Sequence, residues 1–397
     1  MAVPIRSTGK ILIAGGGIGG LATALALAQK GIASLVLEKA SQLGEIGAGI
    51  QLGPNAFHCF DRLGVGEAAR GMAVYIDHLR LMDAMADGEI CHIDLGEAFR
   101  ARYRNPYAVV HRGDLHGVLL KACREHPSIA LEVSSEVTGY EQDGKKVTAK
   151  LGNGKTVTGA ALIGADGLWS NVRRQLVGDG APRVSGHATY RSVIPLEQMP
   201  EDLRWNAATL WAGPKCHIVH YPLSGWKVFN LVVTYHNDAP EPVAGKPVAV
   251  EEVRRGFAHV CERAQTIIRH GIDWKMWVLC DRDPVDKWID GNVGLLGDAA
   301  HPMLQYMAQG ACMAMEDGVC LADALATHDT LAGGLENYRA RRVLRTARMQ
   351  LMSRAMGDHV YHPAGPHASL RNELMSRKSQ PQWLETLDWL YGGNGLN

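Results

Sequence analysis

The sequence lacks a surplus of charge of either sign, and this argues against two broad classes of function. Its 397 residues contain 41 Lys and Arg against 41 Asp and Glu, so the formal net charge is zero. Proteins that bind nucleic acid or an anionic membrane through general electrostatics carry a clustered basic excess. We therefore expect neither nucleic acid nor a membrane among the partners of this chain.

The chain also lacks a Cys-x-x-Cys pair and any regular cysteine spacing, although it contains eight cysteines. In a chain of this length such cysteines are typical of reduced, buried, small apolar residues, so we expect a cytoplasmic protein. His359, His362 and His367 have no acidic or cysteine partner at a matching spacing, and Pro363 interrupts them. We therefore expect no metal site.

No apolar run of membrane-spanning length is present apart from residues 11–28, and five glycines interrupt that run. These glycines, and the lack of a typical cleavage site after them, argue against a signal peptide or a transmembrane helix. No internal repeat, low-complexity segment or long linker stands out either. The length of the chain favours two interlocked globular domains.

What the sequence does contain is a dinucleotide-binding fingerprint near its start. An apolar strand leads into Gly15-x-Gly17-x-x-Gly20, and a helix and a second strand that ends in Glu38 follow. Gly15 allows the tight turn, Gly17 lets a pyrophosphate approach the backbone, and Gly20 lets the helix pack close to the strand. Glu38 is placed to accept hydrogen bonds from a ribose, which favours a ribose without a phosphate. The fingerprint alone leaves NAD and FAD open.

The strand patterns of the rest of the chain predict the fold class. Short strands and helices continue the doubly wound pattern, but a strand pair at 74–96 is not needed by such a sheet. After residue 186, strands alternate with polar turns, which is typical of an antiparallel sheet. We predict an α/β protein with a doubly wound, Rossmann-like domain that is interrupted by a mixed, largely antiparallel β-sheet substrate domain. A helical C-terminal segment follows.

The predicted boundaries follow these changes of pattern. They are 1–73, 97–185 and 275–345 for the cofactor-binding domain, 74–96 and 186–274 for the substrate-binding domain, and 346–397 for the helical C-terminal segment.

Three motifs in a fixed order carry a resemblance to a known family. After the fingerprint come Gly-Ala-Asp-Gly at 164–167 and Gly-Asp-Ala-Ala-His-Pro at 297–302. Together they resemble the single-component, FAD-dependent aromatic hydroxylases of the para-hydroxybenzoate hydroxylase type, over nearly the whole chain. The resemblance implies that FAD is bound noncovalently. The implied cofactor-binding residues are Gly15, Gly17, Gly20, Glu38, Lys39, Arg112, Asp166 and Asp298.

The number of fingerprints supports FAD independently. A single Gly-x-Gly-x-x-Gly lies in a strand–turn–helix context, so the chain has one dinucleotide-binding unit. A flavin that stays bound fits one permanent site, whereas a nicotinamide donor can visit without a Rossmann domain of its own. For Asp166 and Asp298 the structural alternative is ordinary turn chemistry.

Several further stretches are similar to family members that hydroxylate 3-hydroxybenzoate at C6; they are 102–103, 111–116, 213–217, 221–223 and 304–307. The implied reaction converts 3-hydroxybenzoate, NADH and O2 into 2,5-dihydroxybenzoate (gentisate), NAD and water through a flavin hydroperoxide. Hydroxylation of salicylate or 6-hydroxynicotinate is the alternative within the family. A flavoprotein that binds aromatic acids without turnover is an alternative of a different class.

The implied chemistry requires a base for the phenol and donors for the carboxylate. A free phenol has a pKa of roughly 10, so it needs a base nearby to become an electron-rich phenolate. We predict that His217 is this base and that Gln305 positions the substrate or the peroxide. Tyr103 and Tyr221 are predicted to supply hydroxyls to the carboxylate at the opposite end of the ring. No arginine in the sequence obviously marks a carboxylate clamp. Strand histidines and buried tyrosines also have a structural alternative, in which they serve packing.

One basic helix remains outside this scheme. Its five arginines are predicted to form a solvated face or a contact within the chain or between subunits, and we expect a homodimer. They are Arg339, Arg341, Arg342, Arg345 and Arg348.

Overall fold

The computed structural model describes residues 9–44 and 49–396, so residues 1–8 and 45–48 of the predicted cofactor-binding domain lie outside the described residues. A six-stranded sheet of order β19-β20-β12-β1-β2-β8 forms the centre of this domain. Neighbouring strands are parallel except for the β19–β20 pair at one edge. The strands are β1 (Ile11–Ala14), β2 (Ser34–Leu37), β8 (Ile129–Glu132), β12 (Ala161–Gly164), β19 (Ile289–Asp290) and β20 (Val293–Leu295).

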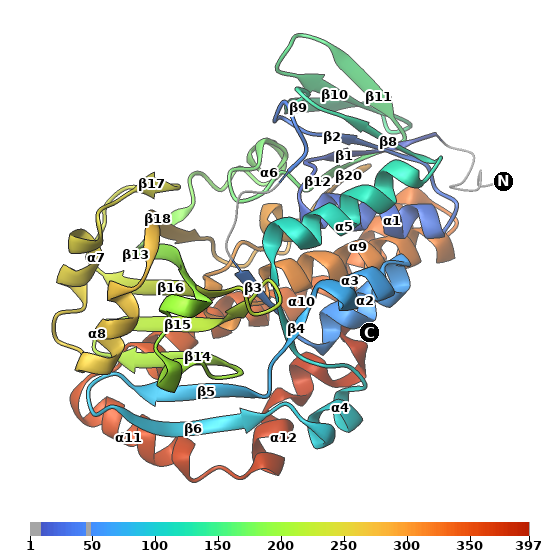
Figure 1. Ribbon diagram of the computed structural model, residues 1–397. Helices are drawn as coiled ribbons and strands as arrows, with labels where there is room; N and C mark the ends of the chain where they lie inside the picture. The colour runs from blue at the N-terminus through green and yellow to red at the C-terminus, as the bar shows by residue number, and fades with distance from the viewer. Residues whose placement is uncertain (1–8, 45–48, 397) are drawn as a thin grey trace.

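Both faces of this sheet are covered, which explains why its central strands are almost entirely apolar. β1, β2 and β12 are buried at every position. Figure 1 shows helices on one side of the sheet and a small three-stranded sheet on the other. These covering elements are α1 (Ile18–Gln29), α5 (Arg112–Glu125), α9 (Gly310–Thr327), β9 (Val137–Gln142), β10 (Val147–Leu151) and β11 (Thr156–Gly159).

The second large sheet has eight strands in the order β17-β18-β13-β16-β15-β14-β5-β6. Its strands pair antiparallel except for β14 and β5, which are parallel. The predicted strand pair at 74–96 supplies β5 and β6 at one edge. The strands are β5 (His78–Asp83), β6 (Gly88–Asp94), β13 (Arg183–Pro195), β14 (Ala207–Gly213), β15 (Cys216–Leu223), β16 (Val228–His236), β17 (Lys246–Pro247) and β18 (Ile272–Asp281).

Two short helices cover the outer face of this sheet. They are α7 (Val250–Gly256) and α8 (Glu262–Arg269). α7 ends at Gly256, where an added Cβ would lie 2.9 Å from the Tyr235 ring. Glycine is a weak helix former, and its lack of a side chain permits this close contact with the sheet. The break between α7 and α8 follows at this position.

A third sheet, β3-β7-β4, lies between the two large ones (Figure 1). Its strand β3 is bonded to the eight-stranded sheet, because Gly49 N donates to Asn230 Oδ1 at 2.8 Å. The sheet and the neighbouring short helices are β3 (Gly49–Leu52), β4 (Val74–Tyr75), β7 (Ala108–His111), α2 (Pro54–Leu63), α3 (Gly66–Met72), α4 (Glu97–Tyr103) and α6 (Asn171–Leu176).

The C-terminal part of the chain is helical, as predicted. α10 (Leu331–Met356) runs into a π-helical turn, η6 (Gly357–Tyr361), and α11 (Gly365–Ser376) and α12 (Gln380–Tyr391) follow. α11 and α12 pack beneath the β5–β6 edge of the eight-stranded sheet (Figure 1). None of the described helices is both long and apolar enough to cross a membrane.

The predicted fold class is therefore confirmed, and each large sheet has its own core. One apolar cluster surrounds the six-stranded sheet and another lies between the eight-stranded sheet and α7 and α8. A third cluster joins strands β7 and β15 to α12. This third cluster connects the domain of the six-stranded sheet to the domain of the eight-stranded sheet, and so it holds the space between them in place.

Gly15 gives the sharpest test of how closely the first turn is packed. Its φ is +103°, and an added Cβ would lie 2.4 Å from the carbonyl oxygen of Ala165, at the end of the neighbouring strand. We expect Gly15→Ala to lower the free energy of unfolding by about 2 kcal/mol or more and to impair FAD retention.

Gly117→Ala is the matched control, because Gly117 is helical and has nothing within 4 Å of an added Cβ. Urea unfolding and the FAD content of the purified variants measure both effects. Equal stability of the two variants would show that the turn is not constrained as described.

Candidate active site

A single cavity of about 850 Å³ lies between the two large sheets and brings together most of the predicted site residues. At one end it is bounded by the first glycine turn and at the other by strand β15. The predicted residues that line it are Gly15, Gly17, Glu38, Lys39, Arg112, Asp166, His217, Tyr221, Asp298 and Gln305. Gly20 and Tyr103 are not among its lining residues. Gly20 instead allows close packing, since an added Cβ would lie 2.0 Å from Gly15 O.

The glycine-turn end of the cavity fits the expected FAD. The N-terminus of α1 has no side-chain cap, so its backbone N–H groups suit a pyrophosphate. Glu38 accepts hydrogen bonds from Gly16 N at 2.7 Å and from Ala40 N at 2.8 Å. These two bonds fix the carboxylate beside the turn, and each oxygen retains a second lone pair for a ribose hydroxyl.

Asp166 shows the turn chemistry that was the structural alternative. Its carboxylate accepts hydrogen bonds from Ser170 Oγ and from Asn171 N at 2.8 Å, at the start of α6. Burial raises the pKa of Asp166 although these bonds oppose the shift. Asp166 nevertheless lines the cavity, so the packing role and the predicted cofactor contact are compatible.

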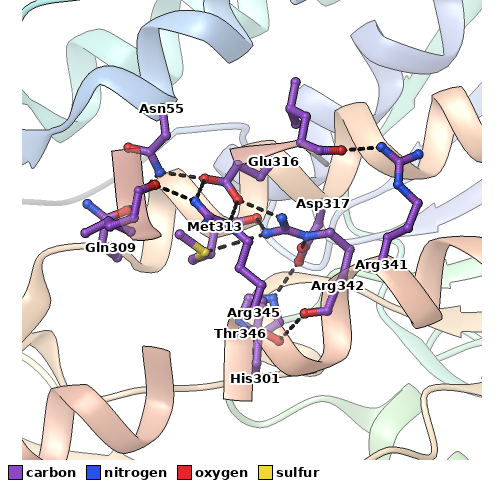
Figure 2. Close-up of polar contacts among 12 residues, drawn as sticks. Asn55, His301, Gln309, Met313, Glu316, Asp317, Arg341, Arg342, Arg345 and Thr346 are labelled. Atoms are coloured by element: carbon purple, nitrogen blue, oxygen red, sulfur yellow. Dashed lines mark hydrogen bonds and ion pairs between the residues drawn. The ribbon is translucent and has the colours of Figure 1, made fainter. Parts of the chain in front are cut away.

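The third motif is held by a network of buried charges, which Figure 2 shows. Gly297, with a φ of +58°, begins the 3-10 turn η4 (Gly297–Ala299) that carries Asp298 to the cavity. Asp317 of α9 accepts hydrogen bonds from Gly297 N at 3.0 Å and from Arg342 Nε at 2.7 Å. His301 Nε2 lies 2.5 Å from the same carboxylate.

Glu316 extends this network to α10 and α2. Arg342 Nη1 and Arg345 Nε each lie 2.7 Å from its carboxylate, and Asn55 Nδ2 donates to it at 2.6 Å (Figure 2). Although burial alone would raise it, the proximity of His301 and Arg342 lowers the pKa of Asp317 to about 2. Both carboxylates are therefore paired charges. For Arg342 and Arg345, the predicted contact within the chain is confirmed.

His217 lies at the other end of the cavity, on β15, and is 2% exposed. Its Nδ1 lies 2.7 Å from His362 Nε2, and His362 Nδ1 lies 2.8 Å from His236 Nε2. Burial, and next His187 and His236, lower the pKa of His217 to about 3. His217 is therefore neutral near pH 7, and its Nε2 is the ring nitrogen left for a ligand.

Gln305 begins the 3-10 turn η5 (Gln305–Met307), and both ends of its amide are engaged. Its Oε1 accepts a hydrogen bond from Arg191 Nη2 at 2.9 Å. Its Nε2 donates to Thr189 Oγ1 at 3.1 Å and to Thr234 Oγ1 at 3.3 Å. The amide is therefore fixed in orientation between β13 and β16.

Arg191 is a functional candidate that the sequence did not reveal. It lines the cavity, and its Nε is buried without a hydrogen-bond partner within residues 9–44 and 49–396. Burial lowers the pKa of Arg191, because the charged form is poorly solvated there. An anionic ligand would relieve this cost, which makes Arg191 a candidate partner for a substrate carboxylate.

The two predicted tyrosines lie in different places. Tyr221 is 3% exposed and lines the cavity on the same strand as His217. Tyr103 is the last residue of α4 and is buried against α12, where its hydroxyl contacts Leu384 O and Asp388. Because this hydroxyl is already bonded away from the cavity lining, the structure does not support the carboxylate role predicted for Tyr103.

Comparisons with known proteins bear on this site. The profile of a family described as FAD binding domain matches residues 8–353. The chain is 54% identical over 382 residues to 3-hydroxybenzoate 6-hydroxylase 1 of Aquipseudomonas alcaligenes, covering 96% of this chain and 97% of that protein. It is 49% identical to 3-hydroxybenzoate 6-hydroxylase of Polaromonas naphthalenivorans (strain CJ2), with 97% and 96% covered.

Solved structures agree on the fold. A salicylate hydroxylase substrate complex matches with a TM-score of 0.82 and covers 98% of each chain. The identity is 24%, so this likeness concerns the fold alone.

Arg342 provides the test of the buried network. Replacing it by Met leaves Glu316 and Asp317 buried without their shared cation, and we expect a loss of about 3–5 kcal/mol in the free energy of unfolding. Arg348→Met is the matched control on the same helix. Arg348 is exposed and stacks on Trp389 with 3.9 Å between its guanidinium carbon and the ring centroid.

We expect this control to cost about 1 kcal/mol or less. Urea unfolding of both variants with excess FAD gives the two values. If Arg342→Met were as stable as Arg348→Met, the network would not be the support of the third motif.

Proposed function

Because this chain belongs to the FAD binding domain family, among its flavin-dependent aromatic hydroxylases, we propose that it hydroxylates 3-hydroxybenzoate at C6. The products are gentisate, NAD and water, and the consumed reactants are NADH, a proton and O2. The observation that carries this proposal is the cavity of about 850 Å³, which joins the FAD end to a neutral histidine and a half-buried arginine. It is supported by the high identity to two 3-hydroxybenzoate 6-hydroxylases over nearly the whole chain.

The position of hydroxylation follows from the electronic demand of the ring. Bound FAD supplies the redox chemistry, since it accepts reducing equivalents from a nicotinamide and activates O2. C6 of 3-hydroxybenzoate is para to the hydroxyl group, so a phenolate directs its electron density there. The protein must therefore hold the ring and remove the phenolic proton.

We assign the proton acceptor to His217 Nε2. The other ring nitrogen is occupied by the contact with His362 at 2.7 Å. A neutral imidazole accepts a proton at one nitrogen only when the second nitrogen carries the ring proton. The contact with His362 can fix that tautomer, because His217 Nδ1–H would then donate to His362 Nε2.

The opposite end of the ring needs donors for the carboxylate. Arg191 supplies the positive charge and Tyr221 a hydroxyl, and both line the cavity. Gln305 acts here as a positioning residue, since its amide holds Arg191 at 2.9 Å. With a neutral base at the phenol and a cation at the carboxylate, the substrate binds in one orientation.

Two alternatives remain to be separated from this proposal by experiment. A hydroxylase for salicylate or 6-hydroxynicotinate would differ only in the product. A flavoprotein that binds aromatic acids without turnover would show no NADH oxidation stimulated by the aromatic acid.

We also propose that the enzyme acts in the cytoplasm as a homodimer. The cytoplasmic location is supported by the eight cysteines, which are all free and of which five are buried.

The homodimer is supported by an apolar stripe on α10, where Leu344 and Leu351 are exposed by 78% and 52%. Sedimentation velocity tests the homodimer, because a species with the mass of one chain would contradict it.

Product analysis with a panel of aromatic acids tests the reaction. We expect the FAD-loaded enzyme to form one gentisate per NADH from 3-hydroxybenzoate, and to be reduced more slowly by NADPH than by NADH. Salicylate and 6-hydroxynicotinate should yield less hydroxylated product per NADH. A different product from 3-hydroxybenzoate, or better coupling with either alternative acid, would refute the assignment.

Replacement of His217 tests the proton acceptor. His217→Ala should retain FAD and still be reduced by NADH, because neither requires the phenolate. Gentisate formation should fall by roughly 10²–10⁴-fold, and hydrogen peroxide should form instead. Gentisate and peroxide per NADH are the quantities to measure.

Two tyrosine variants serve as controls for this experiment. Tyr221→Phe should mainly raise the KM for 3-hydroxybenzoate, whereas Tyr103→Phe should leave KM and coupling unchanged. Normal gentisate formation by His217→Ala would make His217 a structural histidine.

A further inference from the structure

The phenolic proton that His217 accepts has to leave a buried side chain. His217 is 2% exposed, and the cavity around it is lined by Tyr306 and Tyr361. Burial and two neighbouring histidines hold the pKa of His217 at about 3. A proton placed on Nε2 is therefore not stored as a buried imidazolium, so it has to move on as it arrives.

A line of imidazoles leads from His217 away from the cavity. His217 Nδ1 lies 2.7 Å from His362 Nε2, and His362 Nδ1 lies 2.8 Å from His236 Nε2. His362 is 6% exposed and His236 is half-buried, so the line runs from the cavity towards solvent. The three rings come from β15, from the residue after η6 and from β16.

The backbone around these rings keeps them in line. His362 N donates to Gly357 O at 3.0 Å, and Lys215 N donates to His362 O at 3.1 Å. His236 N donates to Lys215 O at 2.9 Å, which ties β16 to the same loop. His187 stacks on His236 with 3.5 Å between ring centroids, while its Nδ1 contacts Tyr306 OH. His187 therefore braces the line without being a member of it.

We propose that His362 and His236 form a proton relay that carries the phenolic proton from His217 to solvent. This proposal rests on the proposed function. The phenolic O–H bond breaks and the proton binds His217 Nε2, while the proton on His217 Nδ1 passes to His362 Nε2. The proton on His362 Nδ1 passes to His236 Nε2, and the proton on His236 Nδ1 passes to water. Every ring stays neutral.

The relay resets within one turnover. After oxygen transfer the former phenol carbon is a ketone, and C6 carries both its hydrogen and the new hydroxyl group. Rearomatisation to gentisate breaks the C6–H bond, whose proton passes to water, and returns a proton to the ketone oxygen. The same line then runs in reverse and restores the starting tautomer of each ring. His362 and His236 never touch the substrate, so they act through His217 as positioning and transfer groups.

The same histidines offer a competing interpretation, which the experiment has to separate. One ring nitrogen each of His187, His236 and His362 lies within 4.8 Å of the others, a spacing that could hold a metal ion. A metal bound at His362 Nδ1 would force its proton onto Nε2. His217 Nδ1 would then accept a hydrogen bond, and Nε2 would carry the ring proton and lose its basicity.

The relay can be tested by measuring proton release separately from substrate binding. FAD-loaded enzyme is mixed without O2 with 3-hydroxybenzoate, in weak buffer that contains a pH-indicator dye. Flavin absorbance reports binding, and the dye reports the released proton. In His362→Gln and His236→Gln we expect binding to persist, proton release to slow by roughly tenfold or more, and gentisate per NADH to fall.

Controls make the result specific to the relay. His359 lies on the same turn, is exposed and contacts His367 at 3.4 Å. The His359→Gln variant should therefore release protons at the wild-type rate. Imidazole added to the solution should restore proton release in His236→Ala, since that ring is near the surface. If His362→Gln fails to retain FAD, His236→Gln decides the question alone.

Three outcomes separate the possibilities. Wild-type rates of proton release and normal coupling in His362→Gln and His236→Gln would overturn the relay while leaving the proposed function intact. A wild-type enzyme that makes no gentisate would instead contradict the proposed function. Loss of wild-type activity after EDTA treatment, restored by Zn²⁺, would overturn the relay in favour of a metal site.

Discussion

The pairing of two buried carboxylates with two arginines is the constraint on which the site depends. Glu316 and Asp317 are both fully buried, and an unpaired charge at such a depth would be strongly destabilising. They therefore fix the register of α9 against α10, and Asp317 holds the turn at Gly297. Arg345 also donates to Trp389 O and Leu390 O at the end of α12, whose side chains line the substrate end of the cavity. One network thus supports both ends of the site.

The cavity that this network supports is asymmetric in charge. Its lining includes His217, which burial keeps neutral, and Arg191, whose Nε is buried without a partner among the described residues. An aromatic acid with a phenol at one end and a carboxylate at the other matches this asymmetry. Burial lowers the pKa of His217 and makes it a poor place to keep a proton, which is the reason for the relay that we propose through the neighbouring imidazoles.

Local features of this chain could be predicted from the sequence, because their physics is local. The first motif is continuous in the sequence, with a strand, a glycine turn, a helix and the acid at Glu38. The alternation of strands and turns after residue 186 indicated the second sheet. His217, Tyr221 and Gln305 do lie on one cavity. The prediction for Tyr103 was not supported, because its hydroxyl bonds to Leu384 O, 281 residues away, which no local pattern reveals.

Residues whose partners are distant in the sequence were the ones missed. Arg191 sits within an ordinary strand, and only its unpartnered Nε in the folded structure sets it apart. His362 drew attention only in relation to its sequence neighbours His359 and His367, and their spacing argued against a metal. Its contacts are with His217, 145 residues away, and with His236. Three histidines on adjacent strands and a histidine in the C-terminal segment were the available signal.

The proposed reaction requires one orientation of the aromatic acid, with its phenol at the neutral His217 and its carboxylate at the half-buried Arg191. A crystal structure of the enzyme with FAD and 3-hydroxybenzoate measures this most directly. We expect the phenolic oxygen to lie within about 3.2 Å of His217 Nε2 and the carboxylate to contact Arg191 and Tyr221. A ring bound the other way round, with its carboxylate at His217, would contradict it.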